Sequence, residues 1–258
     1  VDDAQLCEVG ETTTTLTANV DGGVGTLTYL WSTSDGTIVG DATSQTITVS
    51  SPGTYSVVVS GESIDGTPGG CVSEPASATV TYFPTPSVSA VASDVSCFGA
   101  ADGAITATGS GGSGGDYQYK LNDGTFQASG LFENLGAGNY TITVQDGNGC
   151  IGTTTATITE PAAISLVVNG DAILCNGDTD GNVSGTVSGG TFPYTVTLSG
   201  DADDTQTVTT DGGSYDFANL SGGSYTVTVT DANYSTANGA GCTATNNATI
   251  TEPAAISL

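Results

Sequence analysis

An eleven-residue string, ATITEPAAISL, occupies residues 156–166 and recurs letter for letter at residues 248–258. A repeat of this length indicates a chain built from tandem units, with the string at the boundary between one unit and the next. Apolar residues alternate with threonine and serine on both sides of Glu160-Pro161, the period of two that is typical of half-buried strands. Proline cannot donate to a strand ladder, so one strand is expected to end before Pro161 and another to begin after it. By the same pattern, residues 254–258 are expected to form the first strand of a following unit.

Composition and turn signals favour an all-β fold. The 258 residues include 38 glycines, and no stretch places apolar residues at helical spacing. Short runs rich in threonine and valine alternate with Asp-Gly and Pro-Gly turns, as in antiparallel sheets. We expect three tandem antiparallel β-sandwiches in an extended rod, at residues 1–83, 84–162 and 163–258. Pro84 and Pro86 would form a stiff linker at the first boundary, because proline fixes φ.

The charge balance excludes two classes of partner. Lys120 is the only basic residue against 27 acidic ones, which gives a net charge of −26. Such a surface repels phosphate backbones and anionic lipid heads, so we expect no nucleic-acid partner. No apolar run approaches the roughly 18 residues of a membrane span, so no membrane insertion is expected. No basic segment precedes a signal-like core, so an export signal is expected upstream of Val1 or already removed.

The six cysteines fall two to a predicted unit. Each pair brackets its unit from an early strand to the segment before the last strand, so the economical connectivity among the 15 possible ones has one disulfide per unit. The expected bonds are Cys7–Cys71, Cys97–Cys150 and Cys175–Cys242. Disulfides place the chain in an oxidising compartment. Zinc is the alternative, but the sequence has neither histidine nor a CxxC spacing to favour it.

Catalysis is not expected. The chain has no histidine and one lysine, and its cysteines are assigned to disulfides, so the nucleophile–base pairs and metal–water sites of hydrolases cannot be assembled. Large aromatic residues on alternating strands, and the Gly-x-Tyr hairpins, are expected in the cores instead. These residues are Trp31, Tyr55, Phe132, Tyr140, Phe217 and Tyr225.

Acidic residues gather near the predicted unit ends, and calcium is the one cofactor that their chemistry suits. Carboxylates at alternate positions after a cysteine resemble fragments of a calcium loop, and Glu160 with acids of the neighbouring units could hold an ion at a joint. The candidate ligands are Asp94, Glu160, Asp171, Asp178, Asp180 and Asp231. Asp-Gly and Asn-Gly are also common turn residues, so turn formation is the alternative role for the same side chains.

The second and third predicted units share an ordered motif. Cys97-Phe-Gly with Asp102-Gly matches Cys175-Asn-Gly with Asp180-Gly. A later segment, Phe-x-Asn-Leu-x-x-Gly-x-Tyr-Thr-x-x-Val-x-Asp, runs from 132 to 146 and from 217 to 231, and Thr-Glu-Pro follows in each unit. This combination resembles the SprB-type repeat of gliding adhesins and other very large surface proteins of Bacteroidota. The first unit resembles a PKD-type or immunoglobulin-like bacterial surface domain, on its Tyr29-Leu-Trp strand and Gly53-Thr-Tyr-Ser-Val hairpin.

The resemblance implies a secreted protein of many β-sandwich repeats at the cell surface, associated with the outer membrane and exported by the type IX system. The expected function is a structural repeat segment of a large adhesin or filament in surface attachment or gliding motility. Its partners would be neighbouring repeats of the same chain, with surface polysaccharide or other cell-surface proteins as further candidates. The alternative is a glycan- or protein-binding module, calcium-dependent in one version, centred on residues 1–83 or on an acidic insertion at 201–211.

Overall fold

The computed structural model describes residues 1–258 except 24, 64–65, 67–69, 114, 235–241 and 258. Every regular element in this described part is a β-strand, numbered β1 to β21, which confirms the all-β prediction. No helix there is long and apolar enough to cross a membrane. The chain packs into two compact units. Unit 1 comprises residues 1–91, 106–131 and 140–156, and unit 2 comprises residues 92–105, 132–139 and 157–258.

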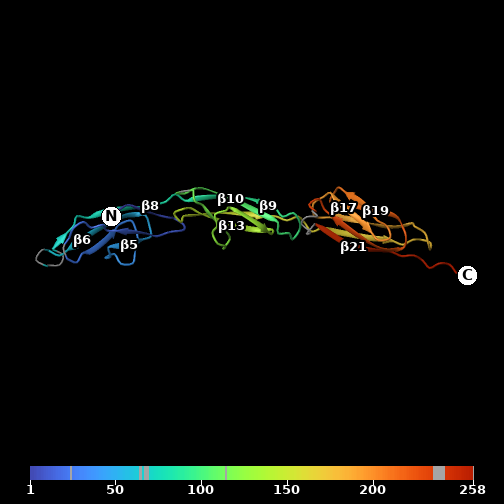
Figure 1. The fold of residues 1–258 in the computed structure, drawn as a ribbon, viewed down its shortest axis with the longest axis horizontal. Helices are drawn as coiled ribbons and strands as arrows, with labels where there is room; N and C mark the ends of the chain where they lie inside the picture. Colours follow the sequence, from blue (N-terminus) through green and yellow to red (C-terminus); the bar gives the residue numbers. More distant parts are fainter. Residues whose placement is uncertain (24, 64–65, 67–69, 114, 235–241, 258) are drawn as a thin grey trace. The chain divides into compact units, whose positions relative to one another are not determined.

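Two sheets of unit 1 come from the first 82 residues (Figure 1). One has the order β1-β8-β6-β3, with β7 paired to β6, and the other has the order β2-β5-β4. β1 runs parallel to β8 and the other pairs are antiparallel. The bounds are β1 Ala4–Leu6, β2 Thr14–Thr17, β3 Thr28–Thr33, β4 Ile38–Val39, β5 Thr46–Val49, β6 Gly53–Gly61, β7 Cys71–Val72 and β8 Ala76–Tyr82.

Alternation along the strands builds the core between these sheets. On β6, Tyr55 and Val57 are buried while Ser56 between them is only half-buried, as the period of two requires. Trp31 is 3% exposed, and its indole N–H donates to the carbonyl of Ser44 at 2.9 Å, so its one polar atom is paired inside the core.

The middle strands form two three-stranded sheets, with the orders β12-β10-β9 and β11-β13-β14. Their bounds are β9 Pro86–Ser93, β10 Gly103–Gly111, β11 Gln118–Leu121, β12 Leu131–Leu135, β13 Gly138–Gln145 and β14 Ile151–Ile158. Phe132 lies on the edge strand β12 and is half-buried, and Tyr140 at the start of β13 is also half-buried. These two aromatic residues are therefore less enclosed than the expected core assignment implies.

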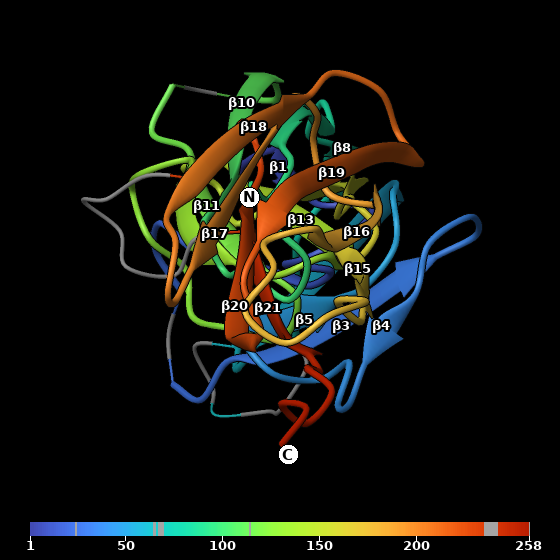
Figure 2. The same ribbon diagram turned by 90° about the vertical axis from the view of Figure 1, so that its right-hand side faces the viewer.

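The last strands of unit 2 form a two-layered sandwich. Figure 2 shows β15, β16 and β19 on one side and β17, β20 and β21 on the other. The acidic insertion at 201–211 contributes β18, which adds to the edge of the second sheet by pairing with β17. The bounds are β15 Ser165–Asp171, β16 Gly181–Ser188, β17 Tyr194–Ser199, β18 Asp204–Val208, β19 Gly213–Leu220, β20 Gly223–Thr230 and β21 Thr243–Ile250. Phe217 and Tyr225 are buried between the layers. Residues 254–257 form no strand, and Leu258 lies outside the described residues.

Gly-x-Tyr hairpins have a specific structural role. The hydroxyl of Tyr55 donates to the carbonyl of Ser51 at 2.7 Å, and that of Tyr225 donates to the carbonyl of Ser221 at 3.0 Å. Each tyrosine thus fixes the corner four residues before it, as in the tyrosine corner of β-sandwiches. Asn219, two residues before Ser221, has a φ of 62°, a left-handed conformation that asparagine tolerates better than most residues.

The disulfide prediction is wrong. The bonds are Cys7–Cys150 in unit 1 and Cys97–Cys242 in unit 2, and Cys71 and Cys175 are exposed free thiols. Each bond therefore joins cysteines of successive predicted repeats. Instead of three bonds, one in each predicted sandwich, the structure contains two.

The geometry of β21 explains the error for Cys175 and Cys242. Gly177 donates its backbone N–H to Glu252, just beyond the end of β21, whereas Cys242 precedes the start of that strand. Eight residues at about 3.3 Å each place the two cysteines roughly 25 Å apart. A disulfide needs Cα atoms about 4.4–6.8 Å apart, so the two ends of one sandwich cannot be bonded to each other.

Candidate functional site: two disulfide joints

Two structural parts meet at each disulfide. We call the segment around the first cysteine the early-cysteine loop, residues 95–102, with its counterpart at 173–180. We call the turn that ends in the second cysteine the late-cysteine turn, residues 146–150, with its counterpart between Asp231 and Cys242. In this second turn, residues 235–241 lie outside the described residues.

Asp102 closes the early-cysteine loop on itself. Its carboxylate accepts the hydroxyl of Ser96 at 2.5 Å and the backbone N–H of Ser96 at 2.9 Å. These two hydrogen bonds, the hydroxyl bond first, hold the pKa of Asp102 below its ordinary value because they stabilise the ionised form. In the second copy, Asp180 accepts the backbone N–H of Leu174 at 3.4 Å. The aspartate five residues after the cysteine is therefore a loop-forming residue in both copies.

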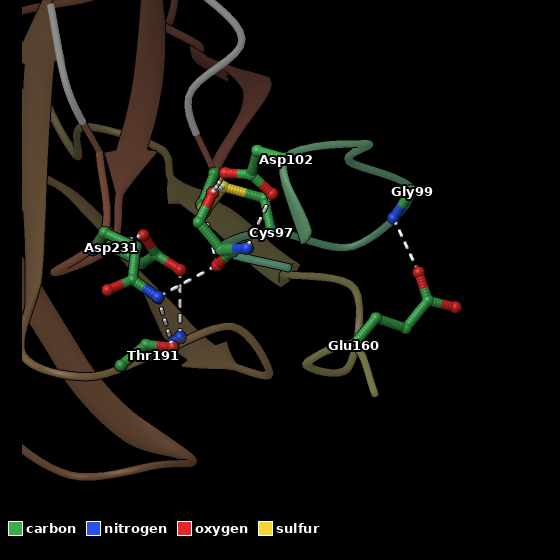
Figure 3. Close-up of a disulfide and its surroundings, with 9 residues drawn as sticks. Cys97, Gly99, Asp102, Glu160, Thr191 and Asp231 are labelled. Atoms are coloured by element: carbon green, nitrogen blue, oxygen red, sulfur yellow. Dashed lines mark hydrogen bonds between the residues drawn. A yellow bond between two sulfur atoms is a disulfide. The ribbon is translucent and has the colours of Figure 1, made fainter. Parts of the chain in front are cut away.

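Glu160 ties the loop to the end of the last strand. Its Oε2 accepts the backbone N–H of Gly99 at 2.7 Å, and Figure 3 shows the Glu160 side chain reaching up to Gly99, on the right of the view. Glu252 repeats the contact with Gly177 at 2.5 Å. The two glutamates of the repeated undecapeptide therefore fix the loop that carries the early cysteine.

Asp94 makes a second tie in the first copy. Its Oδ1 accepts the backbone N–H of Thr159 at 2.7 Å, and the backbone N–H of Val95 donates to the carbonyl of Thr159 at 3.2 Å. The hydrogen bond from the Thr159 backbone is the main reason that the pKa of Asp94 lies below its ordinary value. Because this carboxylate is fully solvated, the contact positions the chain more than it stabilises it.

A buried aspartate organises each late-cysteine turn. Asp146 is 4% exposed, and its carboxylate accepts backbone N–H groups of Ser113, Asn148 and Cys150, each at 3.0 Å. Asp231 is 5% exposed and accepts those of Thr191 and Asn233, each at 2.9 Å. Buried carboxylates are tolerated when their oxygens are satisfied by hydrogen bonds of this kind.

The same turns place the late cysteine in register with its neighbouring strand. The backbone N–H of Asp146 donates to the carbonyl of Cys150, and that of Asp231 donates to the carbonyl of Cys242, each at 3.0 Å. Asp146 therefore contacts its late cysteine through both its side chain and its backbone, whereas Asp231 contacts Cys242 through its backbone.

Backbone contacts accompany the sulfur bond in unit 1. Gly10 forms an isolated antiparallel bridge with Cys150, and the backbone N–H of Ile151 donates to the carbonyl of Val9 at 3.1 Å. Gly10 has a φ of 107°, and a Cβ there would lie 2.2 Å from the carbonyl oxygen of Gly149. Only glycine allows this close approach of the two backbones.

A side-chain contact serves the same purpose in unit 2. The amide of Asn233 donates to the carbonyl of Ser96 at 2.9 Å and to the hydroxyl of Thr191 at 3.1 Å. The early and late cysteines of this joint have Cα atoms 5.2 Å apart, and Figure 3 shows Asp102 and Asp231 on either side of the bond. The Cys97–Cys242 disulfide is therefore accompanied by the hydrogen bonds of Asn233.

The candidate calcium ligands do not assemble into an ion site in the part of the chain that the structure describes. No group of three or more histidine, cysteine, aspartate or glutamate side chains is placed there to share an ion. Four of the six, Asp94, Glu160, Asp180 and Asp231, accept backbone N–H groups as described above. Asp171 ends β15 and Asp178 lies in the turn after Cys175, and both are exposed.

The roles of Asp146 and Asp102 were not predicted from the sequence. The signal for Asp146 was present, because Asp146 and Asp231 each follow the Gly-x-Tyr tyrosine by the same spacing and precede a late cysteine. An aspartate at the start of a turn can close that turn by accepting backbone N–H groups with its side chain.

The all-β elements, the tandem sequence repeats and the disulfides that join cysteines of successive predicted repeats define a protein of repeated β-domains. Residues 89–126 and 173–203 match the family model described as the SprB repeat. The resemblance drawn from the cysteine, glycine and aspartate motifs is confirmed at these two segments. No curated protein matches the chain significantly.

Several solved structures are similar to this chain. A three-immunoglobulin-domain segment of titin is 13% identical, with 98% of this chain and 96% of that chain covered and a TM-score of 0.36. Fibronectin(III)-like modules of Clostridium thermocellum CbhA are 19% identical, with 62% and 90% covered and a TM-score of 0.32. The ectodomain of mouse nectin-like molecule 4 is 11% identical, with 100% and 99% covered and a TM-score of 0.32.

Proposed function

We propose that the chain is a structural repeat segment of a large secreted cell-surface adhesin or filament, which serves surface attachment or gliding motility. It would act outside the cell, at the outer membrane surface, after type IX export. We assign it no catalytic role. The two SprB repeat segments support the class of protein, and the pair of disulfides supports a mechanical role.

The observation that carries this proposal is the double covalent connection between predicted repeats. The main chain crosses the first predicted boundary at 83–84, and the Cys7–Cys150 bond crosses it a second time. The main chain crosses the second boundary at 162–163, and the Cys97–Cys242 bond does so again. A joint with two attachments resists swivelling and shares a pulling force between two routes, as a stalk under tension needs.

The disulfides also limit how far the segment can be stretched. The two bonds interlace, because Cys97 lies inside the loop closed by Cys7 and Cys150. The shortest covalent route runs from Val1 to Cys7, back from Cys150 to Cys97, and on from Cys242. At about 3.4 Å per residue, this route of about 75 residues extends to about 260 Å, whereas the reduced chain extends to about 880 Å.

Single-molecule force spectroscopy tests this role directly. The chain would be held by its two ends and stretched before and after reduction. We expect the maximum end-to-end extension to lie near the shorter length in the oxidised chain and near the longer length after reduction. A variant without Cys7 and Cys97 provides the control, because it should reach the longer length without a reductant. Equal lengths in all three cases would contradict the mechanical role.

A glycan array distinguishes the structural role from the binding role. A structural segment should show no saturable binding on the array. Saturable, calcium-dependent binding that is lost when residues 201–211 are replaced by a short turn would favour the ligand-binding alternative.

A further inference from the structure

The Cys97–Cys242 joint has two halves, and a counterpart of each half occurs elsewhere in the chain, around the free thiols of Cys175 and Cys71. A pocket of about 300 Å³ lies at this joint. One side of it comes from the early-cysteine loop and the undecapeptide, and the other side comes from a glycine turn and the late cysteine. The lining residues are Cys97, Phe98, Gly99, Ala100, Ala162, Ala163 and Ile164 on the first side, and Gly190, Cys242 and Thr243 on the second.

The first half recurs around Cys175. The backbone N–H of Asp178 donates to the carbonyl of Cys175 at 3.2 Å, as that of Ala100 donates to Cys97 at 3.1 Å. Glu252 holds Gly177 as Glu160 holds Gly99. The early-cysteine loop is therefore already formed at Cys175, with its thiol exposed.

An apolar groove accompanies this free thiol. The groove has a volume of about 370 Å³ and is lined by residues 174–176 and 253–256. Leu174 is 81% exposed and Ile256 is 98% exposed. At the occupied joint the equivalent of Ile256 is Ile164, which is partly buried and packs against the core of unit 2. The exposed leucine and isoleucine thus mark a surface that is covered where the joint is complete.

The second half recurs around Cys71. Cys71 pairs with Gly61, six residues after the corner tyrosine Tyr55, and Cys242 accepts from Asp231, six residues after Tyr225. The glycine turn is also repeated. Gly22 and Gly23 have φ values of 91° and 110°, in the same left-handed range as the double glycine at 189–190.

A second apolar groove accompanies Cys71. It has a volume of about 460 Å³, and its lining includes Gly23, Cys71 and Val72, the positions equivalent to Gly190, Cys242 and Thr243. Val72 is 64% exposed. One difference is that Gly61 stands where the other copies have a buried aspartate, and Gly61 contacts Cys71 by backbone pairing.

We propose that these two free halves are complementary, and that the Cys175 face of one copy of this chain docks on the Cys71 face of a second copy. The second copy is the occupant that the chain itself supplies, because Cys71 is the free late cysteine in the described residues. Docking would cover Leu174 and Ile256 with the groove at Val72. It would also bring the two sulfurs together as at the two joints already formed.

The bond forms by oxidation of two thiols. The Cys71 and Cys175 thiols lose two protons and two electrons, and a disulfide oxidant such as oxidised glutathione accepts them and becomes two glutathione thiols. Both faces carry carboxylates, with Asp21 and Glu62 on one and Asp178 and Glu252 on the other. Added salt should therefore speed the docking, because it screens the repulsion between them. This inference goes beyond the proposed function, since head-to-tail bonding does not require any adhesive activity.

Two complementary variants test the proposal. C71S keeps only the Cys175 thiol free, and C175S keeps only the Cys71 thiol free. Each would be incubated with oxidised glutathione alone and in an equal mixture, and the products would be separated without reductant and mapped by mass spectrometry. We expect a covalent dimer, at twice the 25.3 kDa of the chain, in the mixture and at least tenfold less in either variant alone. The linked peptides should contain Cys71 and Cys175.

The opposite outcomes are equally clear. Dimers that form as fast in either variant alone would show indiscriminate thiol oxidation, and the absence of dimer in the mixture would show that the faces do not dock. Either result would overturn the proposal.

A third variant separates docking from thiol chemistry. Leu174→Asp with Ile256→Asp, placed in the C71S chain, should slow the mixed dimer about tenfold. Leu30→Asp is the matched control, because Leu30 is 61% exposed on β3 and outside both grooves. An unchanged rate in the Leu174→Asp, Ile256→Asp chain would also overturn the proposal.

Discussion

Replacement of Cys97 by serine gives a direct test of the disulfide arrangement and of its contribution to stability. The bond closes a sequence separation of 145 residues. On the chain-entropy model, a loop of that length stabilises the folded state by about 5 kcal/mol, close to the upper end of measured values. For a chain of this size the loss corresponds to a decrease in Tm of about 10 to 20 °C. We expect C97S to unfold at a correspondingly lower temperature, whereas C71S should match the wild type.

Lys120 makes the connectivity readable with one protease. Because Lys120 is the only lysine or arginine, a lysine-specific protease cuts the urea-unfolded chain once, into residues 1–120 and 121–258. Free thiols would be alkylated first, and the fragments would be weighed without reductant. In C97S the fragments should stay linked through Cys7–Cys150, and they should separate only when Cys7 is replaced as well.

Bonds within each predicted repeat would give a different result. The only bond across Lys120 would then be Cys97–Cys150, so C97S alone would release the two fragments. Release of the fragments from C97S would therefore refute the structural assignment. A wild-type Tm in C97S with the fragments still linked would instead refute the entropic estimate.

Three further predictions concern individual side chains. D146N should lower the unfolding free energy by about 3 kcal/mol in a urea titration, because an amide cannot accept all three backbone N–H groups. The exposed Asp116 supplies the control variant D116N. Equal effects of D146N and D116N would contradict the role of Asp146 as the acceptor that closes its turn. The pKa values of Asp94 and Asp102 are lowered in the folded chain, so these groups contribute stability that is present above pH 3.8 and is lost as the pH falls through the folded pKa values. The difference in unfolding free energy between wild type and D102N should therefore shrink on acidification below pH 4. A difference that grows below pH 4 would contradict the lowered pKa of Asp102. Burial raises the pKa of Tyr215 to about 12 in the folded chain. The difference in unfolding free energy between wild type and Y215F should therefore decline as the pH rises from about 10 to 12. A spectroscopic titration in which Tyr215 ionises at the ordinary pKa of tyrosine would contradict this prediction.

Much of the fold could be predicted from the sequence because it depends on neighbours along the chain. The alternation of Tyr225, Val227 and Val229 with threonine predicted a strand with one buried face, and β20 has that pattern. The matching cysteine, glycine and aspartate motifs predicted the SprB repeat, which the family comparison confirms. Periodicity and motif spacing are local properties, so they can be recognised in the sequence without knowing which segments pack against each other.

The role of carboxylates was only partly predictable. Asp180 and Asp231 stood out as acids near turns, and two alternatives were left open for them. The structure shows Asp231 buried and saturated by backbone N–H groups. A sequence shows that an acid is near a turn, but burial and the direction of surrounding N–H groups arise only when the turn is folded against its sheet.

The tertiary structure alone decided which cysteines are bonded. The sequence determined where each cysteine falls in its repeat, and counting favoured a bond between the two cysteines of one repeat. Cys175 and Cys242, however, lie at opposite ends of β21, and Cys242 meets Cys97 instead. The repeated undecapeptide likewise marked a boundary by sequence, while its Glu160 proved to hold the early-cysteine loop. Sequence order fixes what is close along the chain, but strand length and the meeting of chain segments in space fix which sulfurs come within bonding distance.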